Sequence, residues 1–334
     1  ARYYPILNVI CRKTNISFLI STKIPMYCFF YTFAAVLIKT LKKYAMKFKI
    51  VVLAKQVPDT RNVGKDAMKE DGTVNRGALP AIYNPDDLNA LEVALQIKEK
   101  RNNTEIIVVS MGPPRAASII RESIFRGADK GYLLTDRKFA GSDTLATSYA
   151  LSKAIEKINP DLIVCGLQAI DGDTAQVGPQ IAEKLHMPQV TYVEKIESID
   201  DKKMVLTRRL ERGVETVILP FPALLTVHGS ACACRPINAK RMLKYKHAHT
   251  TSELQEQNRD YTDIFKEHPY LHIEEWNAEN VGAEEAKLGL SGSPTKVKEI
   301  ESVVLTQKES KRFTEKDQDV DQLMKELLET RVIG

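Results

Sequence analysis

The stretch DLIVCGLQAIDGDTAQVGPQIAEKL, residues 161–185, decides the fold class of this chain. It begins with DLIVC, a short apolar run that is typical of a buried strand, and it ends with a predicted helix over 173–185. The junction contains Asp171, Gly172 and Asp173 but no lysine. A strand that opens into a helix through such a loop usually presents backbone N–H groups to an anion.

The same alternation of strand and helix continues on both sides of this stretch. Further strands are predicted at 48–54, 105–111, 131–135 and 189–193, and further helices at 86–100, 116–127 and 143–158, each starting at or close to an Asp N-cap. Short apolar strands that alternate with helices of this length indicate βαβ units. The sequence therefore predicts an α/β fold with an open parallel sheet that is covered on both faces.

The pattern changes after residue 200. Residues 202–227 predict a β-hairpin extension with its turn at Glu211–Glu215, followed by a strand after Pro222. Beyond 245 the chain is polar and irregular, which predicts an extended arm over 246–334 rather than a second core. The arm ends in a predicted amphipathic helix, 319–330, whose apolar stripe packs either on its own domain or on a partner subunit.

Residues 1–45 differ from the rest in composition, since they hold seven basic residues and no acid. Their apolar run MYCFFYTFAAVLI, 26–38, is too short to span a bilayer comfortably. A signal anchor, an organellar presequence and upstream sequence are three alternatives, and we predict that this leader is no part of the functional fold. The remaining 41 basic and 43 acidic residues give no basic face for nucleic acid and no firm membrane role.

Several classes of site are not indicated by the sequence. The nucleotide fingerprints G-x-G-x-x-G and G-x-x-x-x-G-K-[ST] are absent, and no serine lies in a nucleophile elbow. Five cysteines, two of them in the leader, do not predict a disulfide framework, and Cys165 reads as core. Cys232 and Cys234 form a lone C-x-C without a second pair, so no metal site is predicted. The sequence favours a binding protein of a reducing compartment, the cytoplasm, over a hydrolase.

In an open parallel sheet, ligands bind outside the carboxyl ends of the strands. The segments that follow the predicted strands, or lead into a helix beside them, are rich in Gly, Pro and small polar residues, which lets backbone approach a ligand closely. They are KQVPDT (55–60), YNPDDLN (83–89), MGPPRA (111–116), DRKFAGSDTLATS (136–148) and GLQAIDGDTAQVGP (166–179).

These loops resemble the β subunit of electron transfer flavoproteins, over about residues 46–244 and more weakly through LGLSGSPTKV (288–297) to the end. The motifs that carry the resemblance are VLAKQVPDT, NPDDLNALE, VSMGPP, GADKGYLLTDR, CGLQAIDGDTAQVGPQIAEKL and PALLTV. The resemblance implies a Rossmann-like fold of the adenine-nucleotide α-hydrolase type. In the simple carriers of the family, this subunit holds AMP as a structural ligand.

The resemblance also implies the ligand-binding residues. The positions that match the family's pocket are Leu53, Ala54, Asn84, Pro85, Asp86, Asp87, Met111, Gly112, Gly166, Gln168, Ala169, Ile170, Asp171, Gly172, Asp173, Thr174, Ala175, Gln176, Val177 and Gly178. Simple carriers usually have Asn-Gln-Thr-Gly in the last loop, whereas this chain has the two aspartates. In this interpretation the aspartates cap the loop or accept from ribose or adenine, and Gln176 and Gly178 let the helix start lie close to the phosphate.

This last loop and FAGSDTLATS (139–148) both resemble the electron-bifurcating branch of the family, in which a complete FAD replaces the AMP. FAD carries a diphosphate and a ribityl chain, so a second loop of hydroxyl residues at a helix N-terminus is useful. The residues that would supply this loop are Asp143, Thr144, Thr147 and Ser148.

The resemblance implies a heterodimer with an FAD-containing α subunit, active in electron transfer only together with that subunit and a dehydrogenase. NADH would reduce the FAD of this chain. One electron would go to ferredoxin or flavodoxin, and the other would pass through the α-subunit FAD to an acyl-CoA or hydroxy-acid dehydrogenase. Val214 matches an apolar residue that recognises the partner dehydrogenase. The alternatives are a simple carrier with structural AMP and a non-redox nucleotide sensor of the same fold.

Overall fold

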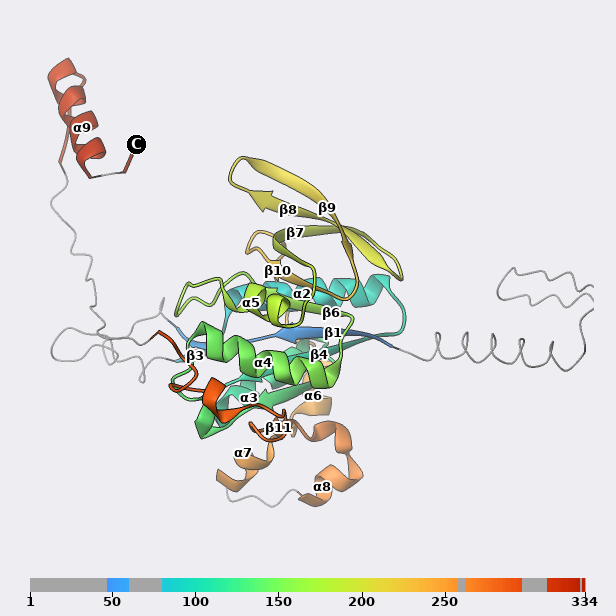
Figure 1. Ribbon diagram of the computed structural model, residues 1–334. Coiled ribbons are helices and arrows are strands. Elements are labelled where there is room, and N and C mark those ends of the chain that lie inside the picture. Colours follow the sequence, from blue (N-terminus) through green and yellow to red (C-terminus); the bar gives the residue numbers. More distant parts are fainter. Residues whose placement is uncertain (1–46, 60–79, 257–261, 296–310, 331, 334) are drawn as a thin grey trace, which may run out of the picture.

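The computed structural model describes residues 47–59, 80–256, 262–295, 311–330 and 332–333. Its main feature is a nine-stranded sheet (Figure 1). In spatial order the strands are β11 (Glu274–Trp276), β5 (Lys130–Leu134), β4 (Thr104–Met111), β1 (Phe48–Leu53), β6 (Leu162–Gly166), β10 (Ala223–Val227), β7 (Gln189–Ile199), β8 (Lys203–Leu210) and β9 (Gly213–Pro220). All pairs from β11 to β7 are parallel, and only β7–β8 and β8–β9 are antiparallel. The predicted α/β fold with a mostly parallel sheet is confirmed.

The central strand β1 is buried on both faces. Ile50 and Val52 belong to one apolar cluster, and Val51 and Leu53 belong to the other, as the two-residue repeat of a strand requires. The first cluster includes side chains of α2 (Pro85–Lys100), α3 (Ala117–Arg126) and α6 (Ala239–Tyr245). The second includes side chains of α4 (Thr144–Ile158) and α5 (Val177–Lys184), which lie in front of the sheet in Figure 1.

The strand order reverses at β1. The chain runs from β1 to β4 and then β5 on one side, and it crosses to β6 on the other side of β1. At such a reversal the connections leave the strands in opposite directions, which opens a crevice at the carboxyl ends of β1 and β6. The site described below lies at this crevice.

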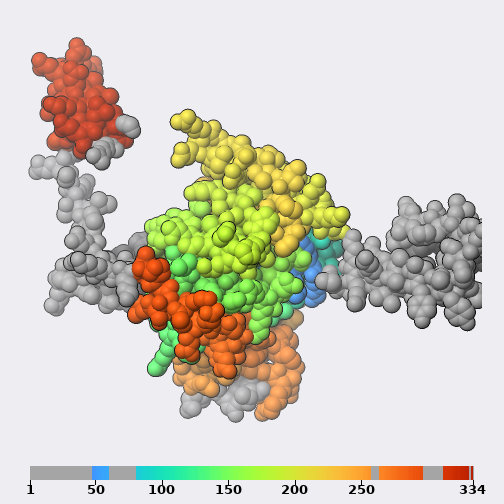
Figure 2. Space-filling view, in the orientation of Figure 1, coloured from blue at the N-terminus to red at the C-terminus, as the bar shows by residue number. Residues whose placement is uncertain are grey.

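The predicted hairpin extension is formed by β8 and β9, with a tight turn at Glu211 and Arg212. Its inner face carries Met204, Leu206 and Leu219, which are buried against the first apolar cluster. Its outer face carries Val214 and Ile218, which are 65% and 60% exposed. Figure 2 shows this region, in yellow, projecting from one end of the domain. The hairpin therefore stands on the core and presents apolar side chains to solvent.

The described part of the C-terminal arm wraps around the domain. It contains α7 (Thr251–Glu256), α8 (Thr262–Glu267) and β11, which extends the sheet beyond β5. The Trp276 ring stacks on the Tyr132 ring with centroids 4.0 Å apart. The last helix, α9 (Asp317–Glu329), buries none of its residues within the described structure. The packing of its apolar stripe on a partner subunit stays a prediction. The boundary predicted between the α/β domain and the arm, at residue 245, stays a prediction as well.

The start of α5 differs from the prediction, because the helix begins at Val177 rather than at residue 173. Asp173 and Ala175 have φ angles of 48° and 52°, in the left-handed region, so they cannot lie in a right-handed helix. The prediction that every helix begins at or close to an Asp N-cap was also wrong for most helices. Only α4 among the four helices predicted in the parallel part begins with a capping aspartate, Asp143, which accepts from the Ala146 N–H at 3.0 Å.

The remaining elements are short. Strands β2 (Gln56–Pro58) and β3 (Ala81–Tyr83) form a separate antiparallel pair, and single 3₁₀ turns are η2 (Pro114–Ala116), η3 (Arg137–Phe139), η4 (Pro269–Leu271) and η5 (Glu285–Lys287). Within the described ranges, no helix has the length and hydropathy needed to cross a membrane. The leader 1–45 lies outside the described residues.

Candidate functional site

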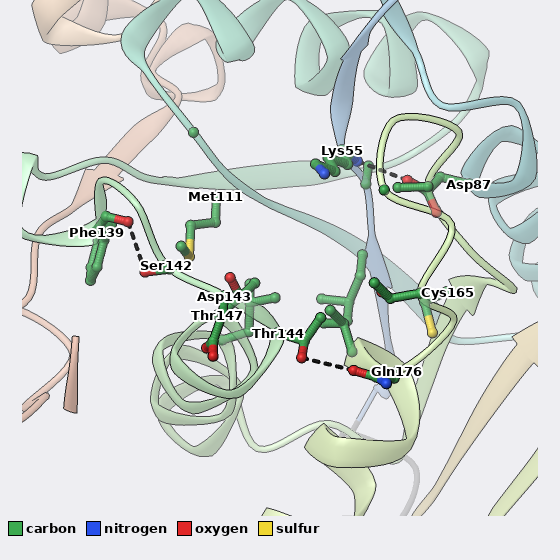
Figure 3. A pocket seen from close by; sticks show the side chains of 18 of the residues that line it. Lys55, Asp87, Met111, Phe139, Ser142, Asp143, Thr144, Thr147, Cys165 and Gln176 are labelled. Atoms are coloured by element: carbon green, nitrogen blue, oxygen red, sulfur yellow. Dashed lines mark hydrogen bonds between the residues drawn. The ribbon is translucent and has the colours of Figure 1, made fainter. Parts of the chain in front are cut away.

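A cavity of about 690 Å³ opens at the carboxyl ends of the strands (Figure 3). Its floor is formed by the ends of β1, β4 and β6, represented by Leu53, Met111 and Gly166. Its walls are the loop 166–178 on one side and the segment 135–144 on the other. Each of the five strand-end segments selected from the sequence therefore contributes at least one residue to the lining of one cavity.

Asp87 is the buried carboxylate of this site, at the amino end of α2. Its Oδ2 accepts the Lys55 N–H at 2.8 Å, and its Oδ1 accepts the Gly166 N–H at 3.1 Å. It thereby ties the end of β1 to the end of β6, where the crevice forms. Burial raises the pKa of Asp87 to about 7, although the hydrogen bonds from Lys55, Asn84 and Gly166 act in the opposite direction.

Asn84 fixes the loop that follows β6. Its side-chain amide donates to the Gln168 carbonyl at 2.8 Å and accepts the Ile170 N–H at 3.2 Å. Asn84 is fully buried and does not line the cavity. Its side chain therefore satisfies two backbone groups of the loop that have no strand or helix partner.

The two aspartates of this loop have separate partners. Asp171 accepts from Lys55 Nζ through both carboxylate oxygens, at 2.8 and 2.9 Å. Asp173 accepts from Gln168 Nε2 at 3.1 Å, which closes the loop on itself. Lys55 lines the cavity, so the site does contain a lysine, supplied by the end of β1 rather than by the loop.

Gly166 and Gly178 are needed for close packing. A Cβ at Gly166 would lie 2.5 Å from Asp87 Oδ1 and 2.6 Å from the Asp86 carbonyl carbon. A Cβ at Gly178 would lie 2.9 Å from both Cys165 Sγ and Thr226 Cγ2. Gly178 therefore lets α5 approach β6 and β10. Gln176, which precedes α5, makes no side-chain cap, so the first-turn N–H groups of the helix receive no hydrogen bond from it.

The amino end of α4 forms the opposite wall. Thr144 Oγ1 donates to Gln176 Oε1 at 2.9 Å, and this bond joins the starts of α4 and α5 (Figure 3). Ser148 is buried and donates to Gln180 Oε1 at 2.9 Å, which makes it part of the same link rather than of the cavity lining. Desolvation acts to raise the pKa of Asp143, but hydrogen bonds from Ala146 and Thr295 hold it below its ordinary value.

Most of the predicted binding residues line this cavity. The predicted residues that are not part of the lining are Asn84, Pro85, Asp86, Ser148, Ile170 and Asp171. The lining also includes polar residues that the sequence did not single out, namely Lys55, Thr135, Asp136, Arg137 and Ser142. All of these except Thr135 lie in strand-end segments selected from the sequence. Their position directly after a predicted strand could therefore have identified them as lining residues. Ligand contacts of the predicted residues stay predictions.

Comparison with known proteins identifies the family. Residues 71–250 match the family model described as the electron transfer flavoprotein domain. The chain is also 46% identical over 248 residues to the electron transfer flavoprotein subunit beta of Thermoanaerobacterium thermosaccharolyticum, which covers 74% of this chain and 85% of that protein. The chain belongs to the electron transfer flavoprotein β-subunit family.

Other relatives belong to named reductase systems. The caffeyl-CoA reductase-Etf complex subunit CarD of Acetobacterium woodii is 44% identical over 250 residues, which is 75% of this chain and 86% of that protein. The acryloyl-CoA reductase electron transfer subunit gamma of Anaerotignum propionicum is 50% identical over 181 residues, 53% of this chain and 66% of that protein. The family match spans α2 to α6 of this electron transfer flavoprotein chain and so includes both walls of the cavity.

Proposed function

We propose that this electron transfer flavoprotein β chain binds a complete FAD in the cavity and takes part in electron bifurcation. The observation that carries the proposal is the extent of the cavity. It reaches from the end of β6 to the end of β5, across three inter-strand spacings, or ~14 Å at ~4.8 Å each. An extended ligand fits this shape better than a mononucleotide with a single phosphate.

The chemistry of the lining supports the same ligand. Gly172, Thr174 and the first turn of α5 offer backbone N–H and hydroxyl groups on one wall, and Thr144 and Thr147 offer hydroxyls on the other. Lys55 also lines the cavity, and its ammonium is paired with Asp171 of the loop that forms the first wall. Two polar walls can hold a diphosphate and a ribityl chain, whereas AMP needs only one.

Bound FAD supplies hydride and single-electron chemistry, and the protein supplies position and electrostatics. In this proposal the donor is NADH and the acceptors are ferredoxin or flavodoxin and, through an α-subunit FAD, an acyl-CoA or hydroxy-acid dehydrogenase. The names of the two reductase relatives, which both refer to CoA esters, favour an acyl-CoA dehydrogenase. We place this system in the cytoplasm.

The bifurcation proposal is tested with the heterodimer, the partner dehydrogenase and ferredoxin. We expect NADH-dependent ferredoxin reduction only when the dehydrogenase and its oxidised substrate are both present. Ferredoxin reduction that does not depend on the dehydrogenase substrate, or none under any condition, would contradict bifurcation while leaving cofactor content as a separate question.

A simple carrier that holds structural AMP is the second candidate function. The observation that favours it is that the wall formed by the loop 166–178 is held by hydrogen bonds to Asn84 and Asp87. These bonds do not involve α4, so this wall alone could hold a mononucleotide. Such a subunit would pass electrons from a dehydrogenase without using NADH.

Val214 on the outer face of the hairpin is proposed to recognise the partner dehydrogenase. We expect Val214→Glu to weaken dehydrogenase binding by about tenfold or more, since a buried interface apolar residue would become charged. The stability should change by no more than about 0.5 kcal/mol, because this exposed side chain is outside the core. Val214→Ile should retain binding. Equal affinity of wild type and Val214→Glu in a binding titration would rule out this role.

A further inference from the structure

Arg137 is the charged residue of the cavity lining whose side chain has no partner among the residues that the structure describes. Lys55 and Arg137 are the two basic residues of the lining. Lys55 is held by Asp171, whereas the exposed guanidinium of Arg137 makes no hydrogen bond or ion pair within the described part of the chain. Because Lys55 is already paired and Arg137 is not, an anionic group of a ligand would be favoured next to Arg137.

The four acids of the lining make no ion pair with Arg137, and the carboxylate of each accepts hydrogen bonds from other groups. Asp136, its neighbour in sequence, accepts the Lys138 N–H at 3.0 Å and the Ala278 N–H at 3.1 Å. Asp143 accepts from Ala146 and from Thr295 Oγ1, the latter at 2.7 Å. Asp87 and Asp173 are bound to the β1–β6 junction and to the loop after β6. The positive charge of Arg137 therefore stays available to a ligand.

The backbone that carries Arg137 is fixed on both sides. Phe139, two residues on, is buried in the second apolar cluster, and its carbonyl accepts from Ser142 Oγ at 2.8 Å. The Gly289 N–H in turn donates to Ser142 Oγ at 3.2 Å, so the C-terminal arm braces this turn. A charged group on a rigid turn loses less freedom when it binds than one on a mobile loop.

We propose that Arg137 selects a dinucleotide over a mononucleotide by pairing with the second phosphate of a diphosphate. The inference rests on the proposed FAD site and names the residue that distinguishes FAD from AMP. Arg137 follows the end of β5, on the far side of the cavity from the loop 166–178. A mononucleotide whose phosphate lies against that loop and α5 leaves Arg137 unused, whereas a diphosphate that continues toward α4 approaches it.

Adjacent Lys138 provides a matched control. Its ammonium pairs with Glu285, and it lines only a smaller neighbouring cavity, whereas Arg137 lines both that cavity and the one described above. Removing either charge changes the net charge of this turn equally. Only removal of Arg137 is expected to change ligand selection.

The test uses the full chain bound to its α subunit, with FAD retained in the α subunit and the cavity of this chain emptied. ADP and AMP, which differ by one phosphate, are titrated by calorimetry. We expect the wild type to bind ADP about tenfold more tightly than AMP, the value of one charge-assisted contact. Arg137→Gln should abolish that preference and leave AMP affinity within about twofold. Arg137→Lys should retain part of it, and Lys138→Gln all of it.

The outcomes separate this inference from the proposed function. If Arg137→Gln keeps the full preference for ADP, or if it weakens AMP binding as much as ADP binding, Arg137 does not select the second phosphate. Either result would leave the proposal that this chain binds FAD untouched. If the wild type purifies with AMP and takes up no FAD in this chain, the proposed function fails, and the inference fails with it. Unchanged melting temperatures should accompany all three variants, since neither side chain supports the core.

Discussion

Gly166→Ala is expected to lower the free energy of unfolding by about 2–3 kcal/mol and to weaken nucleotide binding by about tenfold or more. The new Cβ would lie 2.5 Å from Asp87 Oδ1 and 2.6 Å from the Asp86 carbonyl carbon. Backbone of α2 cannot give way without moving the helix, so the clash separates α2 from β6. The Asp87–Gly166 hydrogen bond would be lost, and with it the shape of the crevice. Chemical denaturation and nucleotide titration measure the two effects.

Gly172→Ala is the matched control, because a Cβ at Gly172 meets no atom within 4 Å. Its stability should stay within about 0.5 kcal/mol of the wild type. Equal stability of the Gly166 and Gly172 variants would show that the β6–α2 contact is not as close as the structure has it.

Asp87→Asn is expected to change how stability depends on pH. The pKa of Asp87 is raised to about 7 in the folded chain by burial, against 3.8 as its ordinary value. Between these values the folded state binds more protons than the unfolded state. The contribution of Asp87 therefore makes the wild type lose stability as pH rises from about 4 to about 7, by at most ~1.4 kcal/mol per pH unit.

Asparagine has no proton to release, so the variant lacks this contribution. The stability of the wild type minus that of Asp87→Asn should fall between pH 4 and pH 7 and stay constant above that range. Denaturant titrations of both proteins at several pH values measure this difference. A difference that is independent of pH would show that Asp87 ionises in the folded state as it does in the unfolded state.

The parallel sheet could be predicted because its strands are continuous apolar runs. DLIVC and FKIVVL can be buried on both faces only in a covered parallel sheet, and the structure places them as neighbours. Strand β11 could not be predicted in the same way. Its three residues, Glu274 to Trp276, are mostly polar, and its place in the sheet is determined by pairing with β5 and by the stacking of Trp276 on Tyr132.

The place of the cavity could be predicted, but the hydrogen-bond partners of several side chains around it could not. Strand ends meet at one edge of a parallel sheet, which is why the selected segments surround one cavity. The amide of Asn84 binds backbone groups of the loop after β6, a contact that the sequence does not indicate, and its ligand contact stays a prediction. Aspartate adopts the left-handed conformation of Asp173 more often than most residues do, whereas nothing in residue type indicates that conformation at Ala175.

The most direct measurement is the FAD and AMP content of the heterodimer formed by this chain and its α subunit. Acid extraction followed by chromatography releases and separates both ligands. Two FAD and no AMP per heterodimer is the result we predict, with one FAD in the cavity between β6 and β5. One FAD and one AMP would contradict the account, because the α4 wall of the cavity would then hold no part of a flavin nucleotide.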